Sequence, residues 1–228
     1  MKLFNKNSTL TGIKSAATPR AQGLGEEIAN SIVHGIGAGL SITALALLVV
    51  FSARTGDAWR IVSSSIYGST LVFLYMSSTM YHGLAHPGAK RLFKIFDHAS
   101  IFLLIAGTYT PIALVTLRGP WGWTIFGLIW AMAIGGILAK IFFIGKFKGL
   151  SVAIYIAMGW LIVIAINPLL KVAPPGLMTW MLIGGLCYTF GVIFYALKKP
   201  LYFHFVWHLF VLAGSICHFF GILFYVSR

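Results

Sequence analysis

The C-terminal part of the chain carries two histidines four residues apart in an otherwise apolar segment. The pentad HFVWH places them at His204 and His208, among Phe, Val, Leu and Ile residues. Positions i and i+4 project from the same face of an α-helix, so both imidazole rings can present a nitrogen to one ion. Ionisable side chains are costly in an apolar helix and mark functional sites by default. The pair alone is a weak signal, so the other polar residues decide the interpretation.

His82 is the expected third ligand. It ends the stretch SSTMYH, in which Ser78 lies one helical turn earlier. Catalytic zinc commonly takes three protein ligands and a water. Asp97 could accept a proton from that water or orient it, and Ser78 could hydrogen-bond a ligand or the water. We therefore expect Zn²⁺ bound by the three histidines, with Asp97 and Ser78 in catalytic positions.

A polar stripe, E-x-x-N-x-x-x-H, begins the first apolar segment. Its members are Glu27, Asn30 and His34. Residues three and four apart lie on one helix face, so these side chains share a direction. The stripe is expected either to support the metal site from behind its ligands or to stabilise a loop.

Three further histidines are expected outside the ligand set. His218 is ten residues beyond His208, or about 15 Å along a helix, so it would bond across helices or line a cavity. His98 follows Asp97 directly and must point elsewhere on its helix. His86 precedes a proline and is expected in a solvated loop.

Two other interpretations of the site histidines stay open. The rings could hydrogen-bond across helices and hold the bundle together, with no metal. They could also form a proton relay. Metal binding is favoured because a third histidine and a carboxylate are expected at the same depth in the bilayer.

The composition indicates which elements must position these residues. Of 228 residues, 59% are hydrophobic and 9% are charged, whereas soluble domains contain about 25% charged residues. A transmembrane helix needs about 20 apolar residues. Seven stretches fit this length: 30–52, 61–84, 97–117, 121–143, 150–170, 177–197 and 204–226. The predicted fold is an all-α membrane protein, a seven-transmembrane helix bundle.

Basic residues set the expected orientation, because cytoplasmic loops gather Lys and Arg. With the N-terminus in the cytoplasm and the C-terminus outside, twelve basic residues lie inside and five outside. The five outside are Arg54, Arg60, Arg118, Lys171 and Arg228. Residues 1–26 lack the apolar core of a signal peptide and are expected to form a flexible cytoplasmic tail. Residues 27–228 would form the transmembrane domain, with the costly side chains of four spans near its cytoplasmic face.

Several partner classes can be addressed from composition. The +13 net charge orients the bundle and attracts anionic lipid headgroups. No aromatic and basic reading motif accompanies it, so we expect no nucleic-acid partner. Cys187 and Cys217 both fall inside predicted spans, so no disulfide framework is indicated. Glycine-rich helix faces would serve bundle packing and a homo-oligomer alike.

These motifs together resemble the hemolysin III family of the progestin and adipoQ receptor (PAQR) superfamily. The stretches that carry the resemblance are EEIANSIVHGIG, FDHASIFLLIAGTYTP and WHLFVLAGSICHF, and it extends over roughly residues 24–228. The resemblance implies seven helices, a cytoplasmic N-terminus and zinc near the cytoplasmic leaflet of a bacterial inner membrane. By motif it implies His82, His204 and His208 as ligands, with Ser78 and Asp97 at the metal-bound water.

Two functions follow from these patterns. The first is a zinc-dependent hydrolase of a lipid amide or ester, since the resemblance links the superfamily to ceramidase-like chemistry. The second is a non-enzymatic regulator of membrane homeostasis or a pore-forming cytolysin, with structural zinc. Structural zinc usually has four protein ligands, whereas three histidines and a carboxylate are available here. Membrane lipids are the expected substrate or ligand in either case.

Overall fold

The computed structural model describes residues 22–143, 146–197 and 200–228, and its regular elements are all helices. They are α1 (Leu24–Arg54), α2 (Ala58–Gly83), α3 (Pro87–Pro111), the π-helical η1 (Ile112–Leu117), α4 (Pro120–Phe143), α5 (Lys148–Gly159), the 3-10 helix η2 (Leu161–Ala165), α6 (Ile166–Val172), α7 (Pro175–Ala196) and α8 (Phe203–Tyr225). The predicted all-α class is confirmed for the described part of the chain.

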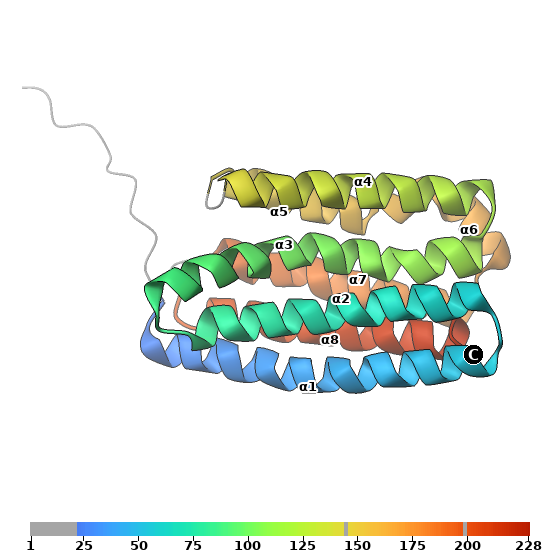
Figure 1. Ribbon diagram of the computed structural model, residues 1–228. Helices are drawn as coiled ribbons and strands as arrows, with labels where there is room; N and C mark the ends of the chain where they lie inside the picture. Colours follow the sequence, from blue (N-terminus) through green and yellow to red (C-terminus); the bar gives the residue numbers. More distant parts are fainter. Residues whose placement is uncertain (1–21, 144–145, 198–199) are drawn as a thin grey trace, which may run out of the picture.

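The long helices run side by side and form a bundle that closes on itself (Figure 1). α1 packs against α2 and α8, α2 against α3, α3 against α4, and α7 against α8. In Figure 1, α4 and α5 lie along one side of the bundle and α1 along the other. Because α8 returns to the side of α1, the last helix can bring its histidines to those of the first two.

The first helix begins slightly earlier than expected. Residues 1–21 of the predicted tail lie outside the described residues, whereas α1 starts at Leu24. A carboxylate oxygen of Glu26 accepts a hydrogen bond from the Gly23 N–H at 3.0 Å. Its other oxygen accepts one from the Tyr202 N–H at 2.8 Å. An acid in the first turn satisfies free backbone donors and favours the helix start, and here it also joins α1 to the start of α8.

Within the described ranges, six helical segments are long and apolar enough to cross a membrane. They are Leu24–Arg54, Pro87–Leu117, Pro120–Phe143, Gly149–Val172, Pro175–Ala196 and Phe203–Tyr225. α2 has 26 residues and stands outside this group. It lies between α1 and α3 and buries polar residues such as Ser63, Ser64 and Ser78 against them. A helix that faces other helices on both sides needs less apolar surface than one that faces lipid.

The third segment begins ten residues before the predicted span. His86 is the N-cap of α3, and its Nδ1 accepts a hydrogen bond from the Ala89 N–H at 3.3 Å, while Pro87 occupies the first helical position. Both features favour a helix start. The exposed His86 is therefore a capping residue, and Asp97 lies well inside α3 instead of at its beginning.

The fifth apolar segment is broken within the bundle. It consists of α5, η2 and α6, with the interruption after Gly159. The Tyr109 hydroxyl donates to the Gly159 carbonyl at 2.8 Å and accepts from the Ile162 N–H at 3.0 Å. Irregular backbone at membrane depth is tolerated where protein satisfies it or where it lines a cavity. Both conditions hold, since Gly159 and Trp160 line an internal cavity.

Candidate metal centre

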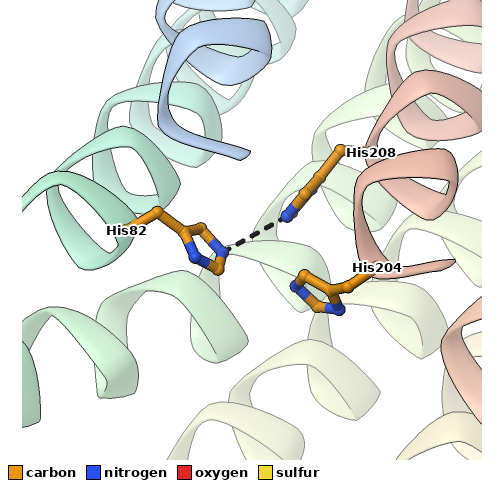
Figure 2. A group of neighbouring side chains, drawn as sticks. All are labelled: His82, His204 and His208. Carbon is orange, nitrogen blue, oxygen red and sulfur yellow. Dashed lines mark hydrogen bonds between the residues drawn. The ribbon is translucent and has the colours of Figure 1, made fainter. Parts of the chain in front are cut away.

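Three histidines from two helices converge at one end of the bundle (Figure 2). His204 and His208 lie one turn apart on α8, and His82 lies in the last turn of α2. One nitrogen from each ring lies within 4.8 Å of the other two, and the Nε2 atoms of His82 and His208 are 3.2 Å apart. The predicted pairing of the HxxxH motif with a histidine from another span is present, and this group can hold a metal ion.

The nitrogen spacing fits zinc. Two imidazole nitrogens on a tetrahedral zinc ion, each at about 2.0–2.1 Å, are separated by about 3.3 Å. The His82–His208 separation of 3.2 Å already matches this value. The third nitrogen needs only a small side-chain rotation, because all three nitrogens lie within 4.8 Å of one another. Three neutral imidazoles are a donor set typical of a zinc site with one open position.

Glu27 fixes the orientation of the His82 ring. Its Oε2 lies 2.7 Å from His82 Nδ1, and its Oε1 lies 3.1 Å from Lys90 Nζ. With the Nδ1 proton donated to the carboxylate, the lone pair of His82 is on Nε2, which faces the other two histidines. A metal ligand whose second nitrogen donates to a carboxylate is a recurrent arrangement that fixes the tautomer and raises ligand basicity.

His34 packs directly on this group from α1. Its ring centroid lies 3.8 Å from that of His208 and 5.0 Å from that of Tyr75. Only 2% of His34 is exposed, and within the described residues neither ring nitrogen has a hydrogen-bond partner. His34 therefore contacts one of the three converging histidines directly. Asn30, one turn earlier on α1, is fully buried, and its Nδ2 donates to Gln22 Oε1 at 3.3 Å.

Unpaired polar atoms gather at this end of the bundle. Among the described residues, eight buried side-chain nitrogens and oxygens have no hydrogen-bond partner, and five of them belong to four residues around the histidines. These residues are Asn30, His34, Ser78 and His208. Buried polar atoms are nearly always paired in folded proteins. Their concentration here supports a bound polar species, in agreement with the donor set.

A cavity of about 500 Å³ opens beside the histidines. His34, His204 and His208 line it on one side. Asp97 lines it from α3, at a distance from the metal-ligand group that leaves it outside that group. This placement suits a proton acceptor better than a ligand. In the described part of the chain, Ser78 is buried with its Oγ unpaired and is not part of the cavity wall.

The remaining histidines lie away from the ligand group. His98 Nδ1 is 2.8 Å from the Lys94 carbonyl and 3.5 Å from an Asp97 carboxylate oxygen. His218 Nε2 lies 3.2 Å from the Met181 carbonyl oxygen of α7, and its ring borders two internal cavities. Both placements agree with the exclusion of these residues from the ligand set.

Two lysines at the site were not anticipated. Lys90 pairs with Glu27, and Lys140 of α4 lines the cavity with 4% of its surface exposed. Sequence reasoning assigned both to cytoplasmic loops. A lysine at the edge of an apolar stretch has the same pattern whether its amine points to water or into the protein, so no signal in the sequence distinguished Lys140.

Comparison with known proteins shows to which family the chain belongs. Residues 22–219 match the family described as haemolysin-III related. A Hemolysin-3 of Bacillus cereus is 49% identical over 195 residues, which cover 86% of this chain and 89% of that protein. The chain belongs to the hemolysin III family. A Hemolysin-3 homolog of Bacillus subtilis (strain 168) is 47% identical over 187 residues, which cover 82% of this chain and 88% of the homolog.

A more distant relative supports the link of this family to the PAQR superfamily. The human monocyte to macrophage differentiation factor is 28% identical over 195 residues, which cover 82% of this chain and 78% of the human protein. No solved structure matches. The bacterial relatives and the apolar helices together identify a multi-pass protein of the bacterial inner membrane.

Proposed function

We propose that this hemolysin III family member is a membrane-embedded zinc hydrolase that cleaves a lipid amide or ester. The observation that carries the proposal is the shared cavity. Two of the three converging histidines face it, and so does the Asp97 carboxylate, which stands apart from the ligand group. A structural site would more often be closed by four protein ligands. Three histidines beside a cavity leave room for a substrate.

The protein side chains have distinct roles in this proposal. A zinc ion at the histidines would polarise the substrate carbonyl and would make a water acidic enough to lose a proton and attack the carbonyl as hydroxide. His82, His204 and His208 would hold that ion, and Glu27 would keep His82 in the correct tautomer. Asp97 would take the proton of the attacking water and return it to the leaving group. Ser78, one turn before His82, would donate a hydrogen bond at the site.

The proposed topology places this chemistry at the cytoplasmic leaflet. α2 would be the seventh span, since it has 26 residues and lies between two spanning helices. The N-terminus would lie in the cytoplasm and the C-terminus outside, because this orientation puts twelve basic residues inside and five outside. Membrane lipids would then reach the cavity from the surrounding bilayer.

A non-enzymatic role is the second candidate, either as a cytolysin or as a regulator of the membrane with structural zinc. The name Hemolysin-3 of the Bacillus cereus relative favours it. The distribution of polar groups opposes a pore. The site cavity is polar at one end of the bundle, whereas the next cavity toward the other end is lined mainly by apolar residues such as Leu104, Ile105 and Val192.

Cleavage of a fluorescent N-acyl sphingosine and of a matched acyl ester tests the proposal. Zinc-loaded protein in detergent should release the fatty acid, and Asp97→Asn should lower the rate by about 100-fold or more, as expected for loss of a general base. His218→Ala is the control, since His218 lies outside the site. Fatty-acid release by Asp97→Asn at the wild-type rate would contradict the role of Asp97. No cleavage of any amide or ester by the zinc-loaded wild type would leave the non-enzymatic candidate.

A further inference from the structure

Two aromatic side chains stand where the site cavity meets a second, apolar cavity. Tyr195, in the last turn of α7, and Trp207, in α8, each line both the site cavity and a cavity of about 120 Å³. Their ring centroids are 5.5 Å apart, and the ring centroid of Tyr195 lies 6.0 Å from that of His204. The junction of the two cavities therefore lies directly beside one of the three converging histidines.

The hydrogen-bond donors of these two side chains have no acceptor in the described part of the chain. Of the described residues, six tyrosines and tryptophans line the apolar cavity. Four of them are hydrogen-bonded to protein groups, namely Tyr109, Tyr155, Trp160 and Tyr188. Tyr O–H and Trp N–H groups usually find a partner when buried. The two that have none, Tyr195 and Trp207, are also the two that line the site cavity.

A neutral acceptor oxygen is the partner that fits these donors. The indole N–H of Trp207 only donates hydrogen bonds, so its partner must accept one. A carbonyl oxygen has two lone pairs and can accept from Trp207 and Tyr195 together. Burial of a carbonyl beside the apolar cavity costs less than burial of an anion. In a lipid amide or ester, the carbonyl links the polar headgroup to the hydrocarbon chain, just as the junction links a polar cavity to an apolar one.

We propose that the Tyr195 hydroxyl and the Trp207 indole N–H bind the carbonyl oxygen of a lipid amide or ester at this junction. The headgroup then lies in the site cavity and the acyl chain in the apolar cavity. When hydroxide attacks the carbonyl carbon, the π electrons of the C=O bond move onto this oxygen. Donors placed there stabilise the charge until the C–N or C–O bond breaks. This assignment rests on the proposed function and adds to it two residues that contact the substrate.

A pair of lipids that cannot be hydrolysed tests this binding without turnover. The first is a monoacylglycerol analogue in which a methylene replaces the ester oxygen, which leaves a ketone. The second has a methylene in place of the ketone carbonyl as well. Native mass spectrometry of the zinc-loaded full chain in detergent measures which lipid is bound from an equal mixture. The wild type should prefer the ketone lipid, and Tyr195→Phe and Trp207→Phe should each reduce this preference about 3–10-fold, as expected for loss of one neutral hydrogen bond.

Donors that are already paired provide matched controls on the same cavity wall. Tyr155→Phe removes a hydroxyl that donates to a backbone carbonyl of α3 at 2.9 Å, and Trp160→Phe removes an indole N–H that donates to Thr189 Oγ1 at 3.1 Å. Both variants should retain the wild-type preference for the ketone lipid. An equal loss in the control variants would overturn the assignment. An unchanged preference in Tyr195→Phe and Trp207→Phe would also overturn it and leave water as the partner of these donors. If Trp207→Phe does not fold, Tyr195→Phe decides the matter.

Hydrolysis of the matching monoacylglycerol separates this assignment from the proposed function. If the wild type cleaves this ester, Tyr195→Phe and Trp207→Phe should lower kcat by about 100-fold, as expected for loss of one donor to the developing charge, and change KM less. Zinc content should equal that of the wild type in both variants. Lost ketone preference with full zinc supports the carbonyl site even where no ester is cleaved. Cleavage by the wild type, with an undiminished ketone preference in both variants, would overturn the carbonyl site and leave the hydrolase in place.

Discussion

Removal of the Glu27 carboxylate should weaken metal binding although Glu27 is not a ligand. Its Oε2 lies 2.7 Å from His82 Nδ1, and the His82 side chain is 0% exposed. Water therefore cannot easily replace the carboxylate. Loss of such a partner typically lowers metal affinity by about 10–100-fold, and each factor of ten is about 1.4 kcal/mol.

The two substitutions at this position should differ in size. Glu27→Ala removes both the charge and the acceptor, so we expect a loss of zinc affinity of about 100-fold. Glu27→Gln keeps an amide oxygen that can accept the Nδ1 proton, so we expect about tenfold. Competition with a zinc-binding dye in detergent measures both values.

Asp57→Asn is the matched control for charge. Asp57 is the N-cap of α2, at the opposite end of that helix from His82, and its carboxylate accepts from the Trp59 N–H at 2.9 Å. This variant should bind zinc as the wild type does. A folded Glu27→Ala protein with wild-type zinc affinity would refute the reasoning, and so would an equal loss in Asp57→Asn.

Two further predictions concern the bundle. A Cβ at Gly37 would lie 2.5 Å from the buried ring of Tyr75, so Gly37→Ala should lower stability by about 1–3 kcal/mol. Gly39→Ala is the control, because a Cβ there meets nothing within 4 Å, and this variant should have the melting temperature of the wild type in detergent. Equal melting temperatures of the Gly37→Ala and Gly39→Ala variants would contradict this packing. Tyr109→Phe removes the hydroxyl that satisfies the break after Gly159, which should cost about 1–3 kcal/mol; an unchanged melting temperature would show that the break has other partners.

Part of the site could be predicted from sequence because its geometry is local or follows from topology. His204 and His208 share a helix face by their spacing alone. His82 ends one span near the face at which α8 begins, so alternation of the spans brings these residues to one end of the bundle. The structure adds that α8 packs against α1. This packing brings histidines that lie at the same depth in the bundle close to one another.

Other features depend on tertiary contacts that leave no periodic signal. The apolar run at 150–170 has no marked break, yet the chain is interrupted after Gly159, where Tyr109 of a different helix supplies the missing hydrogen bonds. The Glu27–Lys90 pair joins residues far apart in sequence. The early start of α3 was missed because its first turns are polar, although Pro87 and the His86 cap are recognisable helix-start signals.

Zinc content of the purified protein tests the central claim most directly. Elemental analysis should find about one zinc per chain in the wild type, as expected for a single three-histidine site. The zinc should be lost in the His204→Ala, His208→Ala double variant and retained in Asp97→Ala and in His218→Ala. A folded wild type without stoichiometric metal after zinc supplementation, or a double variant that retains it, would contradict the metal centre and leave the histidines as contacts that hold the bundle together.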